Sequence, residues 1–188
     1  MHPETKLTLD LFQDYSSART NWARQATEDN EFRAGKQWST KQVNALRNRA
    51  QEPVVVNVIH PAVEQAKAML TSNKPRFQST GREDSDVKVG RLFADLMAWV
   101  WDTSLGNTQL KQAIDDYYVK GMGVLLAYIE PVADFGRGEV MIKSVDPLSV
   151  YFDPSSADPF CRDSASIITA KRITEDPKYA AKMKKLYK

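Results

Sequence analysis

The sequence predicts an α+β fold in which several amphipathic helices, among them a long N-terminal helix and a helical hairpin, pack on a small mixed or antiparallel sheet. Two observations lead to this class. Apolar residues recur at helical spacing through much of the chain, and two short strand-like runs with a turn between them follow at residues 124–130 and 139–145. With 188 residues, 42% of them hydrophobic, the chain is long enough to bury a core. We expect residues 1–188 to form a single domain or a fragment of one.

Charge and cysteine content disfavour several classes of protein. Lysine and arginine number 26 against 24 aspartates and glutamates, so the formal net charge is only +2. A protein that functions by capturing nucleic-acid phosphates is therefore disfavoured. The single cysteine, Cys161, permits neither an intrachain disulfide nor a cysteine-based zinc site. The N-terminus lacks the apolar region of a signal peptide and no stretch is long and apolar enough to span a bilayer, so we expect a soluble protein without a membrane partner.

The first predicted element is an amphipathic helix. It is expected from about Thr8 to Thr27, within an N-terminal helical segment of residues 1–29. Charged residues separate apolar ones that recur at helical spacing, which is typical of a helix with one face on a core. The apolar residues are Leu11, Tyr15, Ala18 and Trp22.

A short polar helix is predicted next, from Thr40 to Asn48. Ser39 precedes it and has a side chain that is favoured as an N-cap. The exposed face of this helix is basic. It makes three residues candidates for contact with DNA or with a neighbouring subunit, namely Lys41, Arg47 and Arg49.

A strand and another helix are predicted after that. Residues 53–57 form a run of β-branched residues, which favours a strand. Asn57 or His60 is then expected to cap a helix that has Pro61 in its first turn. This helix should stop before Pro75, because the residue before a proline avoids the helical region. Residues 76–80 are predicted to form a further strand.

The strongest helical pattern predicts the main core helix. Large apolar side chains recur three and four residues apart and define a wide stripe, and Trp99 falls beside it, where we expect contact with a neighbour. After a break at residues 104–107 the pattern restarts, so a helical hairpin is predicted. The stripe consists of Val89, Leu92, Phe93, Leu96, Met97, Val100 and Trp101, and the second helix carries Leu110, Ala113, Ile114, Tyr117 and Tyr118.

The last third of the chain is predicted to alternate strands and turns. Gly121 and Gly123 end the second helix and lead into a buried strand at residues 124–130. A turn at residues 134–138 then returns the chain as a partner strand. The segments SVYF and ASIITAKRI are predicted as short strands between Asp-Pro turns. A basic helix at residues 174–188 closes the sequence, and because it has no C-cap we expect a truncated helix.

Four aspartates are candidates for a metal centre. Metal-dependent nucleases use two or three acidic ligands to hold divalent cations against a phosphate. Asp-Pro is also a turn former in its own right, and we favour that interpretation because the residues lie in predicted loops. A nuclease that uses Asp146, Asp153 and Asp158 stays open as an alternative. The four aspartates within eighteen positions are Asp146, Asp153, Asp158 and Asp163.

Three further features favour structural roles. Asp115 and Asp116 are adjacent on a helix and point about 100° apart, so they do not readily share a proton or a metal ion, and a solvated helix face is the favoured interpretation. His60 is expected to cap a helix or to lie at the surface. The glycine pairs at residues 121–123 and 136–138 do not match a phosphate-binding loop. No catalytic residue, cofactor site or metal site is predicted.

The turn after the first helix concentrates unusual residues, which are Phe32, Gly35, Gln37 and Trp38. As a hypothesis, Phe32 and Trp38 pin the short basic helix against the core across a turn that Gly35 permits. The alternative is a hydrophobic staple with no role at a subunit contact.

The order of these segments resembles the N-terminal part of tailed-phage portal proteins, particularly those of short-tailed phages. The resemblance runs from about Gln13 to Thr174. It rests on a Phe-x-x-Gly-x-Gln-Trp turn after the first helix, a proline-to-asparagine strand with an Asn-x-Pro exit from the following helix, a Gly-x-Gly pair before a strand, and an Asp-Pro turn after one. The matching residues are Phe32, Gly35, Gln37 and Trp38; Pro53, Asn57, Asn73 and Pro75; Gly121 and Gly123; and Asp153 and Pro154.

This resemblance implies a non-catalytic structural subunit of a ring, usually a dodecamer, at the portal vertex of the virion. It implies assembly in the host cytoplasm and contacts with terminase, capsid and tail or head-completion proteins. Double-stranded DNA would be packaged and ejected through this head-tail connector without sequence specificity. The chain would correspond to the peripheral wing, because the stem and clip of family members lie downstream. A DNA-binding module that uses Lys41, Arg47 and Arg49 is the second alternative.

Overall fold

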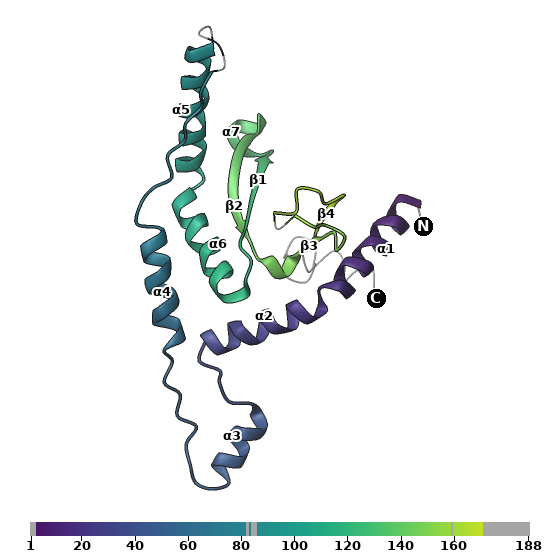
Figure 1. Cartoon of the computed structure of the whole chain (residues 1–188), viewed down its shortest axis with the longest axis vertical. Helices are drawn as coiled ribbons and strands as arrows, with labels where there is room; N and C mark the ends of the chain where they lie inside the picture. Colours follow the sequence, from purple (N-terminus) through teal and green to yellow (C-terminus); the bar gives the residue numbers. More distant parts are fainter. Residues whose placement is uncertain (1–2, 82, 84–85, 159, 171–188) are drawn as a thin grey trace. The chain divides into compact units, whose positions relative to one another are not determined.

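The computed structural model describes residues 3–81, 83, 86–158 and 160–170 (Figure 1). These residues form helices and two small antiparallel sheets, so the predicted α+β class is confirmed. The chain divides into two compact units, one made of residues 1–24 and 148–188 and the other of residues 25–147. The predicted basic helix at residues 174–188 lies outside the described residues.

The first unit packs a helix on a pair of short strands. Helix α1 (Pro3–Ala18) lies against β3 (Val150–Phe152), which pairs antiparallel with β4 (Ile167–Thr169). Tyr15 is buried, and its hydroxyl shares a hydrogen bond of 2.9 Å with the hydroxyl of Ser166. The predicted strands SVYF and ASIITAKRI therefore form, although both are shorter than predicted within the described residues.

The predicted first helix is divided in two at Arg19, where α1 gives way to α2 (Thr20–Arg33). The Arg19 guanidinium lies 4.7 Å from the ring centroid of Trp22 and 4.3 Å from that of Tyr151, and it donates a hydrogen bond to the carbonyl of Val150. Backbone hydrogen bonds continue across the junction. The assignment is therefore interrupted at Arg19 although the helical hydrogen bonds run through it.

Helix α2 ends at Arg33, so the end predicted near Thr27 is wrong. The end is a Schellman motif. The Gly35 N–H donates to the carbonyl of Phe32 and the Lys36 N–H to that of Glu31, both at 2.9 Å. Gly35 has a φ of 84°, a left-handed conformation that glycine adopts without steric penalty. The Phe-x-x-Gly spacing therefore marks a helix C-terminus.

Helix α3 (Thr40–Arg47) forms with Ser39 as its N-cap, as predicted. The Gln42 N–H donates to the Ser39 hydroxyl at 3.3 Å, and the Ser39 N–H donates to the Gln42 side chain at 2.9 Å, which makes a capping box. Figure 1 shows α3 at the end of an arm that leaves the body after α2 and returns to α4 (Ile59–Leu70). No residue of α3 is buried.

The two strands predicted at residues 53–57 and 76–80 are wrong. Neither segment has a partner strand among the described residues. β-Branched residues stabilise a strand by packing on a pleated surface, and that surface exists only where another strand lies alongside. Residues 76–80 instead run beside α5 (Val87–Thr103), where Phe77 packs on Trp101 with ring centroids 5.5 Å apart.

The two helices on either side of the predicted break form as α5 and α6 (Gly106–Lys120). They are joined at Leu105, which adopts a left-handed conformation with φ 53° and ψ 43°. In Figure 1 they follow one another with a bend at this joint instead of folding back side by side. Helix α6 packs against α4 and the sheet.

Helix α5 is not the core helix that was predicted. Only Gly90 and Trp101 are buried on it, and most of the predicted apolar stripe faces outward. Periodicity identifies an apolar face but does not say what covers it. The exposed stripe residues are Val89 at 49%, Leu92 at 68%, Phe93 at 53%, Leu96 at 49% and Met97 at 38%.

The second unit contains the larger sheet. Strand β1 (Val124–Glu130) pairs antiparallel with β2 (Glu139–Val145), and the short helical turn α7 (Ala133–Gly136) lies between them. Both strands were predicted, but the buried character of β1 was not correct, because four of its residues are exposed. None of the described helices combines the length and apolar character needed to cross a bilayer.

The two glycines before β1 have different roles, and their substitution separates them. Gly121 ends α6 with a φ of 76° and open space around it, whereas a Cβ on Gly123 would lie 2.2 Å from the carbonyl oxygen of Ala113. Gly121→Ala is expected to cost about 1 kcal/mol of backbone strain, and Gly123→Ala about 2 kcal/mol, because backbone has to move. Urea unfolding of both variants checks this order. Equal losses would contradict the close approach at Gly123.

Candidate functional site

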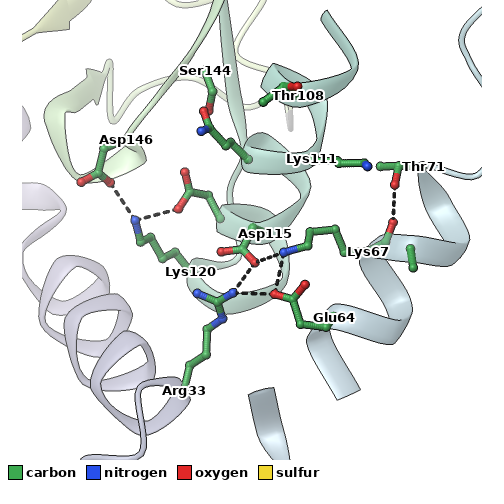
Figure 2. A pocket seen from close by; sticks show the side chains of 13 residues that line it. Arg33, Glu64, Lys67, Thr71, Thr108, Lys111, Asp115, Lys120, Ser144 and Asp146 are labelled. Carbon is green, nitrogen blue, oxygen red and sulfur yellow. Dashed lines mark hydrogen bonds and ion pairs between the residues drawn. The ribbon is translucent and has the colours of Figure 1, made fainter. Parts of the chain in front are cut away.

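A groove of about 680 Å³ lies beside α4 and α6 and is lined mainly by charged side chains (Figure 2). The last residue of α2 and the end of β2 complete its walls. Cations and anions occur in equal number, so the groove has no net charge to attract a polyanion. The cations are Arg33, Lys67, Lys111 and Lys120, and the anions are Glu64, Asp115, Asp116 and Asp146.

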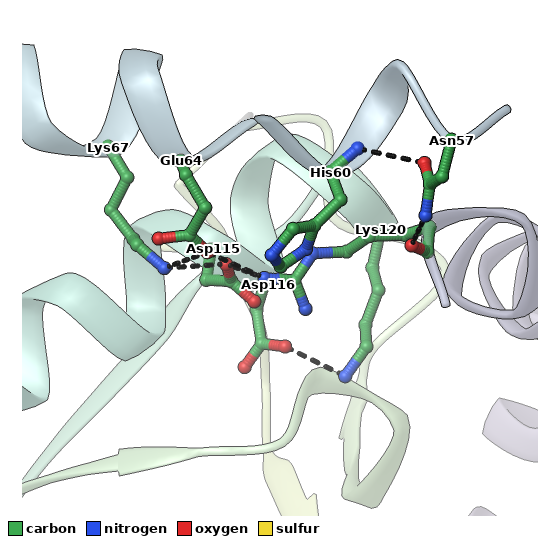
Figure 3. Close-up of polar contacts among 8 residues, drawn as sticks. Asn57, His60, Glu64, Lys67, Asp115, Asp116 and Lys120 are labelled. Carbon is green, nitrogen blue, oxygen red and sulfur yellow. Dashed lines mark hydrogen bonds and ion pairs between the residues drawn. The ribbon is translucent and has the colours of Figure 1, made fainter. Parts of the chain in front are cut away.

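Asp115 on α6 is the centre of a network that joins three helices. One of its carboxylate oxygens lies 2.5 Å from Nη2 of Arg33 and 3.2 Å from Nζ of Lys67. Glu64, one turn before Lys67 on α4, contacts the same two cations at 3.1 and 2.6 Å (Figure 3). The side chains of Arg33, Lys67 and Asp115 are each about 20% exposed. Helices α2, α4 and α6 are thus held together by partly buried ion pairs.

The pKa directions in this network follow from its hydrogen bonds. The hydrogen bond that Lys67 donates lowers the pKa of Glu64. Burial works against the charge on Lys67, but its hydrogen bonds to Glu64 and Asp115 outweigh burial and raise the pKa of Lys67. Both groups therefore stay charged around neutral pH, and the network persists there.

A second network fastens the end of α6 to the end of β2. Nζ of Lys120 lies 2.8 Å from a carboxylate oxygen of Asp116 and 2.9 Å from one of Asp146. Burial raises the pKa of Asp116, against the opposing hydrogen bond from Lys120. Burial also disfavours the Lys120 cation, but the two carboxylates outweigh this and raise the pKa of Lys120. The Lys120 side chain is only 9% exposed.

The structure corrects the solvated face predicted for Asp115 and Asp116. Their side chains are 20% and 19% exposed, and each binds its own cations. The prediction that the two carboxylates point in different directions and share no ligand agrees with this geometry. Sequence reasoning missed Arg33, Lys67 and Lys120 as their partners. Only the i,i+4 spacing of Asp116 and Lys120 offered a local signal.

The charged groups of the groove are arranged so that they hold elements in place. Four of its carboxylates already contact a lysine or an arginine, which leaves them poor general bases. Among the residues that the structure describes, no three histidine, cysteine, aspartate or glutamate side chains converge as a metal site would require. Each network connects elements that are distant in sequence.

The candidate nuclease aspartates stabilise turns. Asp153 accepts hydrogen bonds from the Ser155 hydroxyl at 2.6 Å and from its N–H at 2.9 Å, and these lower the pKa of Asp153. The N–H of Phe160 donates to Asp158 at 2.9 Å. This is the turn interpretation that the Asp-Pro pairs predict.

The remaining carboxylates are engaged in the same way. The hydroxyl of Ser156 and the N–H of Ala157 donate to Asp163 and lower the pKa of its carboxyl. The pKa of Asp158 is lowered as well, and the main cause is the hydrogen bond that Arg162 donates to it. Asp146 contacts Lys120, and both residues belong to the second unit. Each of these four acids therefore has a structural partner.

The predicted Phe-x-x-Gly-x-Gln-Trp turn forms the base of the α3 arm. The side-chain amide of Asn57 donates to the carbonyl of Arg33 at 2.7 Å and accepts from the N–H of His60 at 3.1 Å (Figure 3). Nε1 of Trp38 donates to the carbonyl of Val54 at 3.1 Å. The outgoing and returning segments of the arm are thereby tied to each other.

The hypothesis that Phe32 and Trp38 pin α3 against the core needs correction. Trp38 is 40% exposed and binds the returning segment, and α3 itself has no buried residue. Phe32 lines a hollow with Ile59 of α4 and Tyr118 of α6. Gly35 and Asn57 are close, since a Cβ on Gly35 would lie 3.5 Å from the Asn57 amide nitrogen.

Comparison with known proteins gives the family. The sequence model of the phage P22-like portal protein family matches residues 9–186, nearly the whole chain. The chain belongs to the P22-like portal protein family. No curated protein matches the sequence significantly. The resemblance to portal proteins of the short-tailed type is therefore confirmed, and the role of this portal protein in the phage is structural.

The remaining candidate residues lie on the surface of this portal protein. Lys41, Arg47 and Arg49 are exposed on and just after α3. His60 is also exposed, and Asn57, not His60, supplies the capping side chain at the start of α4. The basic residues are thus accessible to a partner, as a candidate contact requires.

Proposed function

We propose that this portal protein assembles with identical copies into a ring at the portal vertex of the virion. Double-stranded DNA passes through the ring during packaging and ejection, without sequence specificity. Capsid, terminase and tail or head-completion proteins attach to it, and the subunit itself catalyses no reaction. We assign residues 1–188 to the peripheral wing of the ring. The observation that carries the proposal is the exposed apolar face of α5, in a chain that belongs to a portal family.

The α5 face is the kind of surface that a neighbouring subunit covers. Leu92, Phe93 and Leu96 expose between 49% and 68% of their surface next to one another on the helix. Because about half of each side chain is still exposed, a monomer that leaves it in water forgoes about 1 to 2 kcal/mol for each one that a partner would bury. Large contiguous apolar surfaces are typical of interaction sites.

Two further observations support a structural role with sliding DNA. The net charge of +2 and the balanced groove do not provide a strong trap for phosphates, and a conduit has to let a polyanion move. The acidic residues that a nuclease would need are engaged in turns and ion pairs. Contacts with DNA or a neighbouring subunit are assigned to the exposed basic residues of the arm, Lys41, Arg47 and Arg49.

The size and shape of the particle test the proposal directly. The mass of the purified protein is measured by light scattering across a range of concentrations, and the same samples are imaged in negative stain. Closed rings of identical subunits are the expected result. A particle that stays monomeric at every concentration would contradict the proposal. Magnesium-dependent cleavage of plasmid DNA that Asp153→Asn abolishes would favour the nuclease instead.

A charge placed on the apolar face of α5 is expected to prevent assembly. Leu96→Asp should leave the helical content of the subunit unchanged, because the side chain is half exposed, but should abolish rings, because the carboxylate would be buried without a partner. Arg91→Asp introduces the same carboxylate at an exposed polar position of the same helix and is the matched control. Circular dichroism and light scattering check both. Rings formed by Leu96→Asp as readily as by Arg91→Asp would exclude this face from the contact.

A further inference from the structure

In the part of the chain that the structure describes, one edge of the larger sheet is covered and the other is open. The N–H groups of Ile142 and Ser144 on β2 donate to the hydroxyl of Ser104 and the side-chain oxygen of Gln109, at 2.9 and 2.8 Å. These two N–H groups therefore point away from β1. In an antiparallel ladder, pairs of facing residues that bond to each other alternate with pairs whose backbone groups point away from each other. The residues of β1 that face Ile142 and Ser144 therefore point their backbone groups away from β2, toward the opposite side of the sheet. That side is the open edge.

The open edge of β1 consists of the backbone groups of Leu125, Ala127 and Ile129. None of them has a hydrogen-bond partner on that side among the described residues. Proteins usually protect such an edge with charges, proline or a covering segment. Residues 124–129 carry neither a charge nor a proline, and Leu125 and Ile129 are 40% and 68% exposed. An unprotected edge of this kind is a template for another strand.

The chain also contains a stretch that has the character of a strand but no sheet. In residues 53–58 the side chains of Val54, Val56 and Val58 are 73%, 75% and 67% exposed and alternate with less exposed neighbours. This period of two is that of an extended strand. The segment carries no charge. Both its ends are held, one by the hydrogen bond from Trp38 to Val54 and the other by that from Asn57 to Arg33.

The backbone direction of this stretch fits an edge contact. The carbonyl of Val54 accepts from Trp38, so the backbone of Val54 faces the outgoing segment of the arm. In an extended strand the backbone groups of the next residue face the other way. Val55 therefore presents its N–H and carbonyl to the outside, where no described residue binds them.

We propose that residues 53–58 of one copy add to the open edge of β1 in the next copy as a third strand. Within one subunit the two lie apart, because Figure 1 shows the segment in the arm, between α3 and α4, away from the β1–β2 sheet. Every copy offers both halves of the contact, which makes it head to tail and allows a ring to close. Backbone hydrogen bonds supply the attraction, as in other cases of strand addition. The inference rests on the ring proposed above.

Cysteine cross-linking tests the contact. In a Cys161→Ser background, Val56→Cys and Ala127→Cys are combined. These residues lie near the centre of the segment and of the edge, so the two thiols come close whether the added strand is parallel or antiparallel to β1. A short bifunctional thiol reagent tolerates a register shift of one residue. Denaturing gels should show a ladder of dimers, trimers and larger species up to the ring. Each single-cysteine variant is the control and can give no species beyond a dimer.

The outcomes distinguish the inference from the ring itself. Rings in negative stain without a ladder would overturn the strand addition and leave the ring standing. A cross-link within one chain would overturn it as well, and a protein that never assembles would overturn both. Val55→Pro, which removes an N–H from a segment without regular structure, should lower the cross-linking yield at least tenfold, whereas Val55→Ala should not. Equal yields for the two would count against backbone pairing.

Discussion

Trp101→Ala is expected to lower the free energy of unfolding by roughly 3 to 5 kcal/mol, the range for removing a large aromatic side chain from a core. Trp101 is 8% exposed, packs on Phe77, and donates a hydrogen bond from Nε1 to the side-chain oxygen of Asn107 at 3.2 Å. A Cβ on Gly106 would lie 2.3 Å from its ring, so backbone also packs against the indole. Alanine leaves a cavity at the joint of α5 and α6. Urea unfolding measures the loss.

Trp99→Ala is the matched control for this experiment. Trp99 is 51% exposed and lies on the same helix, so its removal should cost less than about 1 kcal/mol of subunit stability. The pair therefore compares the same substitution in and out of the core. Similar losses for the two tryptophans would show that the joint is not the organising core of α5.

The second large effect is expected at the centre of the three-helix network. Asp115→Ala should cost about 3 kcal/mol, the low end of the range for breaking a buried ion pair, because the side chains involved keep about a fifth of their exposure. The loss arises from Arg33 and Lys67, which stay partly buried after their shared carboxylate is gone. Nε of Arg33 already has no hydrogen-bond partner within the described part of the chain. Denaturant unfolding at a fixed protein concentration measures the effect.

An exposed ion pair between Asp102 of α5 and Lys74 provides the comparison. Asp102 lies 3.8 Å from Lys74, and both side chains are more than 70% exposed. Asp102→Ala should therefore change the free energy of unfolding by no more than about 0.5 kcal/mol, as is usual for a surface pair. If Asp115→Ala were as mild as Asp102→Ala, the network around Asp115 would contribute nothing to holding α2, α4 and α6 together.

Local signals in the sequence predicted local structure well. Ser39 predicted the start of α3, because its hydroxyl accepts a hydrogen bond from an N–H of the first turn that has no partner within the helix. Gly121 marked the end of α6, and the runs at β1 and β2 with a turn between them predicted a hairpin. In each case the interacting groups lie close together in sequence, so the pattern contains the whole interaction.

Burial was not predictable in the same way. The stripe on α5 and the valines of residues 53–58 have the periodicity of a packed helix and a paired strand. Periodicity predicts which side chains share a face, but it does not predict which surface covers that face. In the ring proposed above, an apolar face that is exposed on one subunit would be covered by another copy, so periodicity alone does not predict burial within the subunit.

The ion-pair networks escaped prediction for a related reason. Arg33 and Asp115 are 82 positions apart, and nothing around either residue identifies the other. Asp115 and Asp116 were read as solvated because charged residues on a helix usually are. Their burial depends on how α2 and α4 pack on α6, which is tertiary information.

The arm that carries α3 is closed at its base by a hydrogen bond between residues 24 positions apart, from Asn57 to Arg33. Closing a loop costs conformational entropy that grows only with the logarithm of its length, so doubling the loop adds about 0.6 kcal/mol. Insertions or deletions beyond Trp38 can therefore change how far α3 reaches while the body of the subunit keeps nearly the same stability. Changes in the length of this arm therefore have little effect on the stability of the subunit, so the arm can be lengthened or shortened to fit the surface that α3 contacts.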